Sequence, residues 1–139
     1  MQVDGAASRD RFLTALVVMM GLMALSNFSK PITQSVSGGS AGFVFFGTRL
    51  YGTANAIVGP IFGALLAAYA YGVWTRRRWV LPLAFVYAGY VIVNLILFMW
   101  IEPPAEAPPL AGMLAYAAVA VGVSGGGAYY LARHRELLR

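Results

Sequence analysis

Four apolar stretches, each close to the length needed to cross a lipid bilayer, constrain the fold of this chain most. A transmembrane helix needs about 20 mostly apolar residues. The four stretches cover about 12–28, 55–74, 79–101 and 110–131. The chain has 139 residues, so these stretches leave little from which to build a soluble domain. We therefore predict an all-α integral membrane protein, with residues 1–139 forming a single bundle of four transmembrane helices.

The composition agrees with this prediction. Hydrophobic residues make up 60% of the chain and charged residues 11%, whereas a soluble domain carries about 25% charged residues. Such a chain has too few polar groups to cover a globular surface, so the bilayer is its natural solvent. In a soluble protein the net charge of +5 would favour nucleic acid as a partner. Here the basic residues flank apolar stretches, which favours the lipid bilayer as partner and argues against nucleic acid.

The basic residues also predict an orientation. They lie before the first stretch, between the second and third, and after the fourth: Arg9, Arg11, Arg76, Arg77, Arg78, Arg133, Arg135 and Arg139. Positive charge in short connections marks the cytoplasmic side of a membrane. All three segments fall on one side if both termini are cytoplasmic, and the acidic, proline-rich loop 102–109 is then outside. We expect a bacterial-type inner (cytoplasmic) membrane.

The first stretch also has an interpretation as a signal peptide. Arg9 and Arg11 precede it, and Ala24-Leu25-Ser26 resembles a small-residue cleavage site. Two acidic residues, Asp4 and Asp10, precede the stretch as well, which is unusual for a signal peptide. We expect the stretch to be retained as the first span.

Residues 29–54 form the predicted outer linker, and its two halves differ. The stretch 26–42 is polar and contains Gly38 and Gly39, which predicts a loop. The stretch 41–53 is apolar, but a single helix over 41–74 would be roughly 50 Å long, against a hydrocarbon core of about 30 Å. We therefore expect the segment before the second span to lie along the outer interface, or to dip into the membrane and return.

Arg49 lies in that segment and has two interpretations. In the first, its side chain reaches the outer headgroups, with Tyr51 as an interfacial anchor. In the second, Arg49 faces the bundle and binds an anionic group, because charges at membrane depth usually serve a function.

The third span carries a polar stripe. Tyr87, Tyr90 and Asn94 are spaced by three and four residues, so they share one helix face. An amide in hydrocarbon needs a hydrogen-bond partner, and Asn55 of the second span is one candidate. These groups either hold helices together or line a ligand pocket. The candidate ligand-binding residues are Arg49, Asn55, Tyr87, Tyr90 and Asn94.

Small residues recur every four positions in the second and fourth spans. Residues four apart share a helix face, and small side chains there allow another backbone to approach closely. We predict that these faces are helix interfaces and that the second and fourth spans form a close pair. The residues concerned are Gly52, Ala56, Pro60, Ala64, Gly59, Gly63, Ala118, Gly122 and Gly126.

The spans lack the side chains that several functions require. None contains Asp or Glu, although proton-coupled transporters need a carboxylate within the membrane. The small multidrug transporters are similar in size and glycine content, but their defining first-helix glutamate has no counterpart in residues 12–28. The chain has no cysteine, its one histidine, His134, lies in a basic tail, and the glycines at 125–127 lack the context of a phosphate loop. We identify no catalytic residue, metal ligand or cofactor, and an enzyme is less favoured than a non-catalytic protein.

Two function classes remain. The favoured one is a non-catalytic accessory, assembly or interaction subunit that associates with other membrane chains, or with itself, through the small-residue faces. The alternative is a binder or carrier of a small lipophilic or anionic molecule in a polar pocket within the membrane. Arg76, Arg77 and Arg78, between Trp74 and Trp79, are also predicted to contact anionic lipid headgroups.

Overall fold

The computed structural model describes residues 3–36, 38, 42–101 and 110–139. The elements in chain order are α1 (Val3–Phe28), α2 (Lys30–Val36), β1 (Phe43–Phe45), β2 (Thr48–Leu50), α3 (Gly52–Trp74), α4 (Val80–Ile101), α5 (Leu110–Arg133) and a short 3-10 helix, η1 (Arg135–Leu137). Four helices, α1, α3, α4 and α5, are long and apolar enough to cross a membrane. This confirms the prediction of four apolar helices. The predicted outer loop 102–109 lies outside the described residues.

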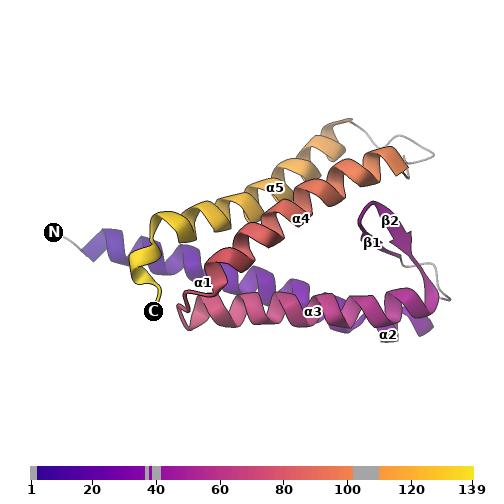
Figure 1. Cartoon of the computed structure of the whole chain (residues 1–139), viewed down its shortest axis with the longest axis horizontal. Coiled ribbons are helices and arrows are strands. Elements are labelled where there is room, and N and C mark those ends of the chain that lie inside the picture. The colour runs from indigo at the N-terminus through magenta and orange to yellow at the C-terminus, as the bar shows by residue number, and fades with distance from the viewer. Residues whose placement is uncertain (1–2, 37, 39–41, 102–109) are drawn as a thin grey trace.

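The long helices pack as two pairs (Figure 1). α1 lies along α3, and α4 lies along α5. The pairs meet at the end that holds both termini and the α3–α4 turn, which we call the closed end, and they spread apart toward the other, open end. The predicted close pairing of the second and fourth spans is therefore wrong. One small-residue row of α3 is filled by α1, while space remains open over Gly122 and Gly126 of α5.

The core between the two pairs is concentrated toward the closed end. Tyr69 and Val73 of α3 and Val80 and Ala84 of α4 are buried there, together with the last turns of α5. Gly72 lets α3 approach α4 closely, since a Cβ on it would lie 3.0 Å from the Val80 Cβ. Small side chains thus bring the two pairs into contact at this end.

Backbone hydrogen bonds fasten the end of the chain to the α3–α4 turn. Arg139 N–H donates to the Arg76 carbonyl at 2.6 Å, and Arg78 N–H donates to the Arg139 oxygen at 3.0 Å. The basic segments 76–78 and 133–139 consequently lie side by side at the closed end.

The prediction of a loop over 26–42 is wrong for its first part, because α1 continues to Phe28 and α2 covers Lys30–Val36. Pro31 is tolerated in the first turn of α2, where backbone N–H groups have no helical partner. The Ser35 hydroxyl donates to the Pro31 carbonyl at 2.9 Å, so a polar side chain is satisfied within the helix. Polar composition alone did not separate this short helix from a loop.

The apolar segment after α2 turns back as a β-hairpin, residues 43–50. Its strands are antiparallel, with Phe43 opposite Leu50 and Val44 opposite Arg49. The two turn residues, Phe46 and Gly47, have positive φ values of 47° and 79°, the geometry of the tight turn that suits the twist of a hairpin. In Figure 1 the hairpin lies at the open end of the molecule, between α3 and α4.

Candidate functional site

A cavity of about 500 Å³ lies between the two helix pairs and the hairpin. Every long helix and the hairpin segment contribute to its wall. The lining residues are Met19, Met23, Gly42, Phe43, Val44, Arg49, Phe62, Tyr87, Tyr90, Val91, Asn94, Leu95, Phe98, Tyr116, Val119, Ala120 and Val123. We refer to this space as the cavity. It is the candidate site because four of the five predicted ligand-binding residues line it.

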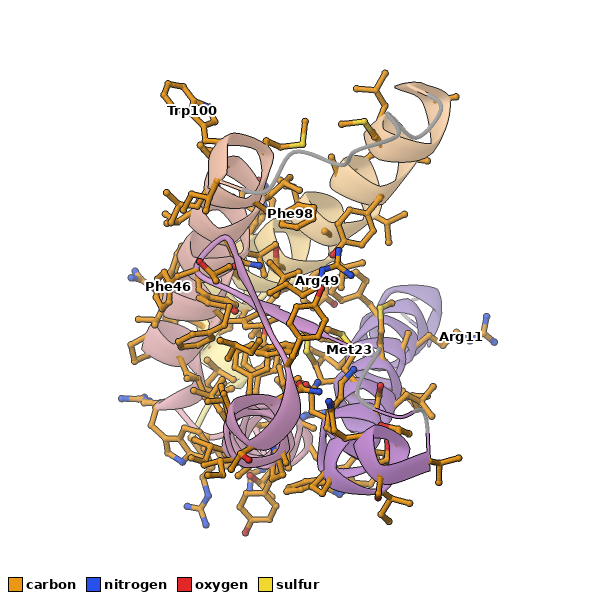
Figure 2. All side chains as sticks on the ribbon, turned by 90° about the vertical axis from the view of Figure 1, so that its right-hand side faces the viewer. Arg11, Met23, Phe46, Arg49, Phe98 and Trp100 are labelled. Carbon is orange, nitrogen blue, oxygen red and sulfur yellow. The ribbon has the colours of Figure 1, made fainter. Side chains whose placement is uncertain are left out.

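Arg49 supplies the positive charge of the cavity. Its side chain is half-buried, and its guanidinium carbon lies 5.6 Å from the centroid of the Phe98 ring, a cation–π arrangement. Gly42 makes room for it, because a Cβ at that position would collide with the Arg49 side chain. In Figure 2, Arg49 lies between Phe98 and Met23, whereas Arg11 and Trp100 project from the edges of the molecule.

Asn94 joins the polar stripe of α4 to the hairpin. Its Oδ1 accepts a hydrogen bond from the Gly47 N–H at 3.0 Å, and its Nδ2 donates to the Val44 carbonyl at 3.5 Å. The Tyr90 hydroxyl donates to the same carbonyl at 3.5 Å. Backbone groups that lie among apolar side chains outside a helix need such partners. Asn94 therefore stabilises the hairpin while it lines the cavity.

Aromatic rings form the part of the cavity nearer the closed end. The Phe62 ring lies 5.2 Å from the Tyr90 ring and 6.3 Å from the Tyr87 ring, centroid to centroid. On the other side of the hairpin tip, Phe46 meets Tyr90 edge to face at 5.3 Å. The cavity thus has Arg49 and Asn94 toward the open end and the rings of Phe62, Tyr87 and Tyr90 toward the closed end.

The cavity opens between α1 and α5. These helices touch near the closed end, where the rings of Phe12 and Tyr130 are 4.3 Å apart, and they diverge toward the open end (Figure 1). Met19 of α1 and Tyr116 and Val119 of α5 line the cavity beside this opening. Tyr116 and Val119 are 68% and 63% exposed, so apolar and aromatic side chains form the rim.

Asn55, the fifth predicted ligand-binding residue, lies elsewhere. It is fully buried, and its Nδ2 donates a hydrogen bond to Oε1 of Gln34. This contact joins α3 to α2 and is separate from the residues that line the cavity. The structure therefore does not bring Asn55 to the candidate site.

The predicted interface residues fall into two groups: some lie against another part of the chain, and others face open space. A Cβ on Gly59 would lie 2.8 Å from the Lys30 side chain, and one on Gly63 would lie 3.1 Å from the Ala24 carbonyl oxygen. These two glycines therefore serve contacts within the chain. Open positions, where the residue is exposed or a Cβ would meet no atom within 4 Å, are Gly52, Ala64, Ala118, Gly122 and Gly126; Ala56 and Pro60 are half-buried.

Several residues of the site were missed by the sequence analysis. Phe62, Phe98, Met19 and Met23 lie within the predicted spans but were not among the predicted ligand-binding residues. Gly47 was also missed, although a glycine after four apolar residues of high β-propensity, 43–46, is a signal of a hairpin turn. A Cβ on Gly47 would lie 2.6 Å from the Leu97 backbone, so this glycine lets the hairpin reach α4.

The lining of the cavity offers groups that can bind a ligand. Within the described part of the chain, no group of three or more His, Cys, Asp or Glu residues could hold a metal ion. The lining residues offer one guanidinium, one amide and two buried or half-buried phenols against a mostly apolar wall. Such a wall can hold a molecule that is largely apolar and carries a polar or anionic group.

Comparison with protein families, with curated proteins and with solved structures finds no match to this chain. The geometry described above is therefore the basis on which a function is argued.

Proposed function

We propose that this membrane protein binds, and holds or carries within the bilayer, a small lipophilic molecule that bears an anionic group. The observation that supports the proposal is the cavity of about 500 Å³ with Arg49 in its wall. Ligand pockets typically have volumes of about 300–1,000 Å³ and place a few polar groups in a largely apolar wall.

The distribution of polarity gives the ligand an orientation. Arg49 and Phe98 mark the part of the cavity toward the open end, and Phe62 and Tyr87 the part toward the closed end. An anionic group placed at Arg49 leaves the apolar body to lie against the aromatic rings. The opening between α1 and α5 gives such a molecule direct access from the lipid.

The proposed topology fits this orientation. With both termini in the cytoplasm of a bacterial-type cell, the closed end faces inward and the hairpin lies in the outer half of the membrane. Arg49 then reaches toward the outer headgroups while it also lines the cavity. The two interpretations of Arg49 from the sequence are therefore compatible.

Native mass spectrometry of protein extracted gently from its own membrane tests the proposal. We expect a monomer or small homo-oligomer that carries a discrete added mass. Arg49→Ala should weaken binding of that molecule about tenfold or more, because a hydrogen bond to a charged group contributes about 1.5–3 kcal/mol. Arg49→Lys, which keeps the charge, should retain more affinity. Arg11→Ala is the matched control, since Arg11 projects away from the molecule (Figure 2).

Absence of any added mass, or an unchanged affinity in Arg49→Ala, would contradict the proposal. In the second case the ligand lies outside the cavity, and Arg49 serves the hairpin alone.

A second candidate function is an accessory or interaction subunit. The observation that favours it is the open row on α5, where a Cβ on Gly122 or Gly126 would meet no atom within 4 Å. Small residues on an open face allow close approach of a helix from another chain. We expect Gly122→Leu with Gly126→Leu to disrupt such an association, whereas Gly21→Leu, on the open face of α1, should not. Equal association of both variants in native mass spectrometry would exclude this face as the interface.

A further inference from the structure

The arginines at the closed end form a second feature, which the cavity does not explain. Two segments far apart in the sequence contribute to it: 75–79 in the α3–α4 turn, and 133–139, which begins at the last residue of α5. Together they contain six arginines and one acidic residue, Glu136: the arginines are Arg76, Arg77, Arg78, Arg133, Arg135 and Arg139. Like charges at this density repel one another, so a fold that gathers them calls for a physical reason.

The two segments are held in a fixed relation. The backbone bonds between Arg76, Arg78 and Arg139 described above tie them together, and the Arg78 Nε also donates to the Leu138 carbonyl at 3.4 Å. Leu138 is buried, which anchors the end of the chain against the helices. The arginine side chains therefore project from a preorganised platform, and preorganisation lowers the entropy cost of binding.

A hollow of about 410 Å³ lies in this platform. It is lined by Arg78, Leu81, Arg135, Glu136 and Leu138. The two arginines come from different segments, and both are exposed. The leucines give the hollow an apolar wall beside the two guanidinium groups. A ligand that fits this hollow has a phosphate group, for the guanidinium groups, attached to an apolar chain, for the leucines.

Trp74 and Trp79 indicate where this platform stands relative to a bilayer. They flank the α3–α4 turn and are 68% and 45% exposed. Tryptophan is enriched at the membrane–water interface, so the hollow between Arg78 and Arg135 lies near the level of the lipid phosphates. Arginine pairs with phosphate oxygens through two parallel N–H···O bonds.

We propose that the hollow between Arg78 and Arg135 binds the phosphate headgroup of an anionic phospholipid. One arginine from the turn and one from the C-terminal segment hold the phosphate, and Leu81 and Leu138 contact the glycerol and the start of the acyl chains. Glu136 opposes the negative charge of the ligand and limits the affinity. This site extends the expected lipid contact of the 76–78 triplet to a discrete hollow that depends on both segments.

The test is native mass spectrometry of the full chain released from bilayer discs that contain phosphatidylglycerol and phosphatidylcholine in equal amounts. We expect the wild type to retain one phosphatidylglycerol in preference to phosphatidylcholine. Arg78→Gln with Arg135→Gln should lower this retention about 25-fold, since each arginine near an anionic lipid contributes about fivefold. Glu136→Gln should raise it.

Arg11→Gln with Arg133→Gln is the matched control, because it removes the same charge from the same end of the molecule outside the hollow. We expect this control to lose less than about fivefold. Equal losses in the two double variants would overturn the proposal, since a diffuse positive field would then explain the retention. Arg135→Gln alone keeps the hydrogen bond from Arg78 to the C-terminal segment. A lower lipid retention in this variant would therefore reflect lost binding and not damage to the platform.

Inorganic phosphate distinguishes a lipid from a free phosphate ligand. We expect retention of phosphatidylglycerol to persist in excess inorganic phosphate, because the acyl chains add apolar contacts. Displacement of the lipid by phosphate alone would overturn the lipid assignment and identify a free phosphate as the ligand.

Discussion

The same long helices build the closed and open ends of the molecule, yet one end is packed and the other holds a cavity. At the closed end, Gly72 lies against Val80, and Gly127 lies against Leu16. At the open end, the residues between the helix pairs are large: Phe62, Tyr90 and Phe98. Glycines therefore allow close approach at the closed end, alongside larger buried side chains such as Tyr69.

The difference shows that hydropathy and packing carry separate information. An apolar residue predicts that a helix lies in the membrane, but in lipid it does not drive helices together, because lipid tails are as apolar as leucine. Helices associate in lipid where their backbones approach each other closely, and such an approach requires small residues. At the open end a hairpin and a cavity fill the space between the pairs.

The largest expected effect comes from a large residue at the closed end. Gly72→Leu should lower the free energy of unfolding by about 3 kcal/mol, because its side chain overlaps the buried Val80. Unfolding in mixed micelles measures the change. Gly89→Leu is the control, since a Cβ on Gly89 meets no atom within 4 Å. Similar stabilities for the two variants would show that the closed end is not tightly packed.

A smaller effect is expected at the open end. Gly47→Ala should release the hairpin from α4 at a cost of about 2 kcal/mol, because the methyl group meets the Leu97 backbone and the residue has a positive φ. Faster hydrogen exchange at the hairpin amides measures the release. Gly52→Ala separates the two causes, since Gly52 also has a positive φ but open space around it. Equal exchange in both variants would assign the effect to backbone strain.

The smallest effect concerns the polar stripe of α4. Asn94→Ala should destabilise hairpin docking by about 1 kcal/mol, through loss of its bonds to Gly47 and Val44. Tyr90→Phe should have less effect, since its one bond to the hairpin, at 3.5 Å, is long. Hydrogen exchange at the Gly47 amide distinguishes the two. A larger effect of Tyr90→Phe would mean that the hairpin docks mainly on the tyrosine.

The four long helices could be predicted from the sequence because length and apolar character suffice to identify a span. The polar stripe of α4 was also identified, since the spacing of Tyr87, Tyr90 and Asn94 is visible without any partner. The hydrogen-bond partner of Asn94 was not identified. Asn94 contacts the backbone of the hairpin, and backbone groups leave no pattern in the sequence. Hydrogen bonds to backbone groups are specified by where a segment lies, not by which residues it contains.

The pairing of the helices could not be predicted for a related reason. Small-residue rows occur on both α3 and α5, and the pattern does not state which helix fills each row. Gly59 and Gly63 contact α2 and α1, while a Cβ on Gly122 or Gly126 would meet no atom within 4 Å. The position of Asn55 followed from this arrangement, because its partner Gln34 belongs to a helix that the sequence analysis took for a loop.

The hairpin has a consequence for the order of assembly during synthesis. It lies between α2 and α3 in the chain, but the groups that hold it, Tyr90 and Asn94, belong to α4. During synthesis, residues 43–50 leave the ribosome well before α4 does. The hairpin therefore lacks Tyr90 and Asn94 as partners until α4, the third long helix, has been inserted. We therefore expect the N-terminal half to reach its final form only after the third span has entered the membrane.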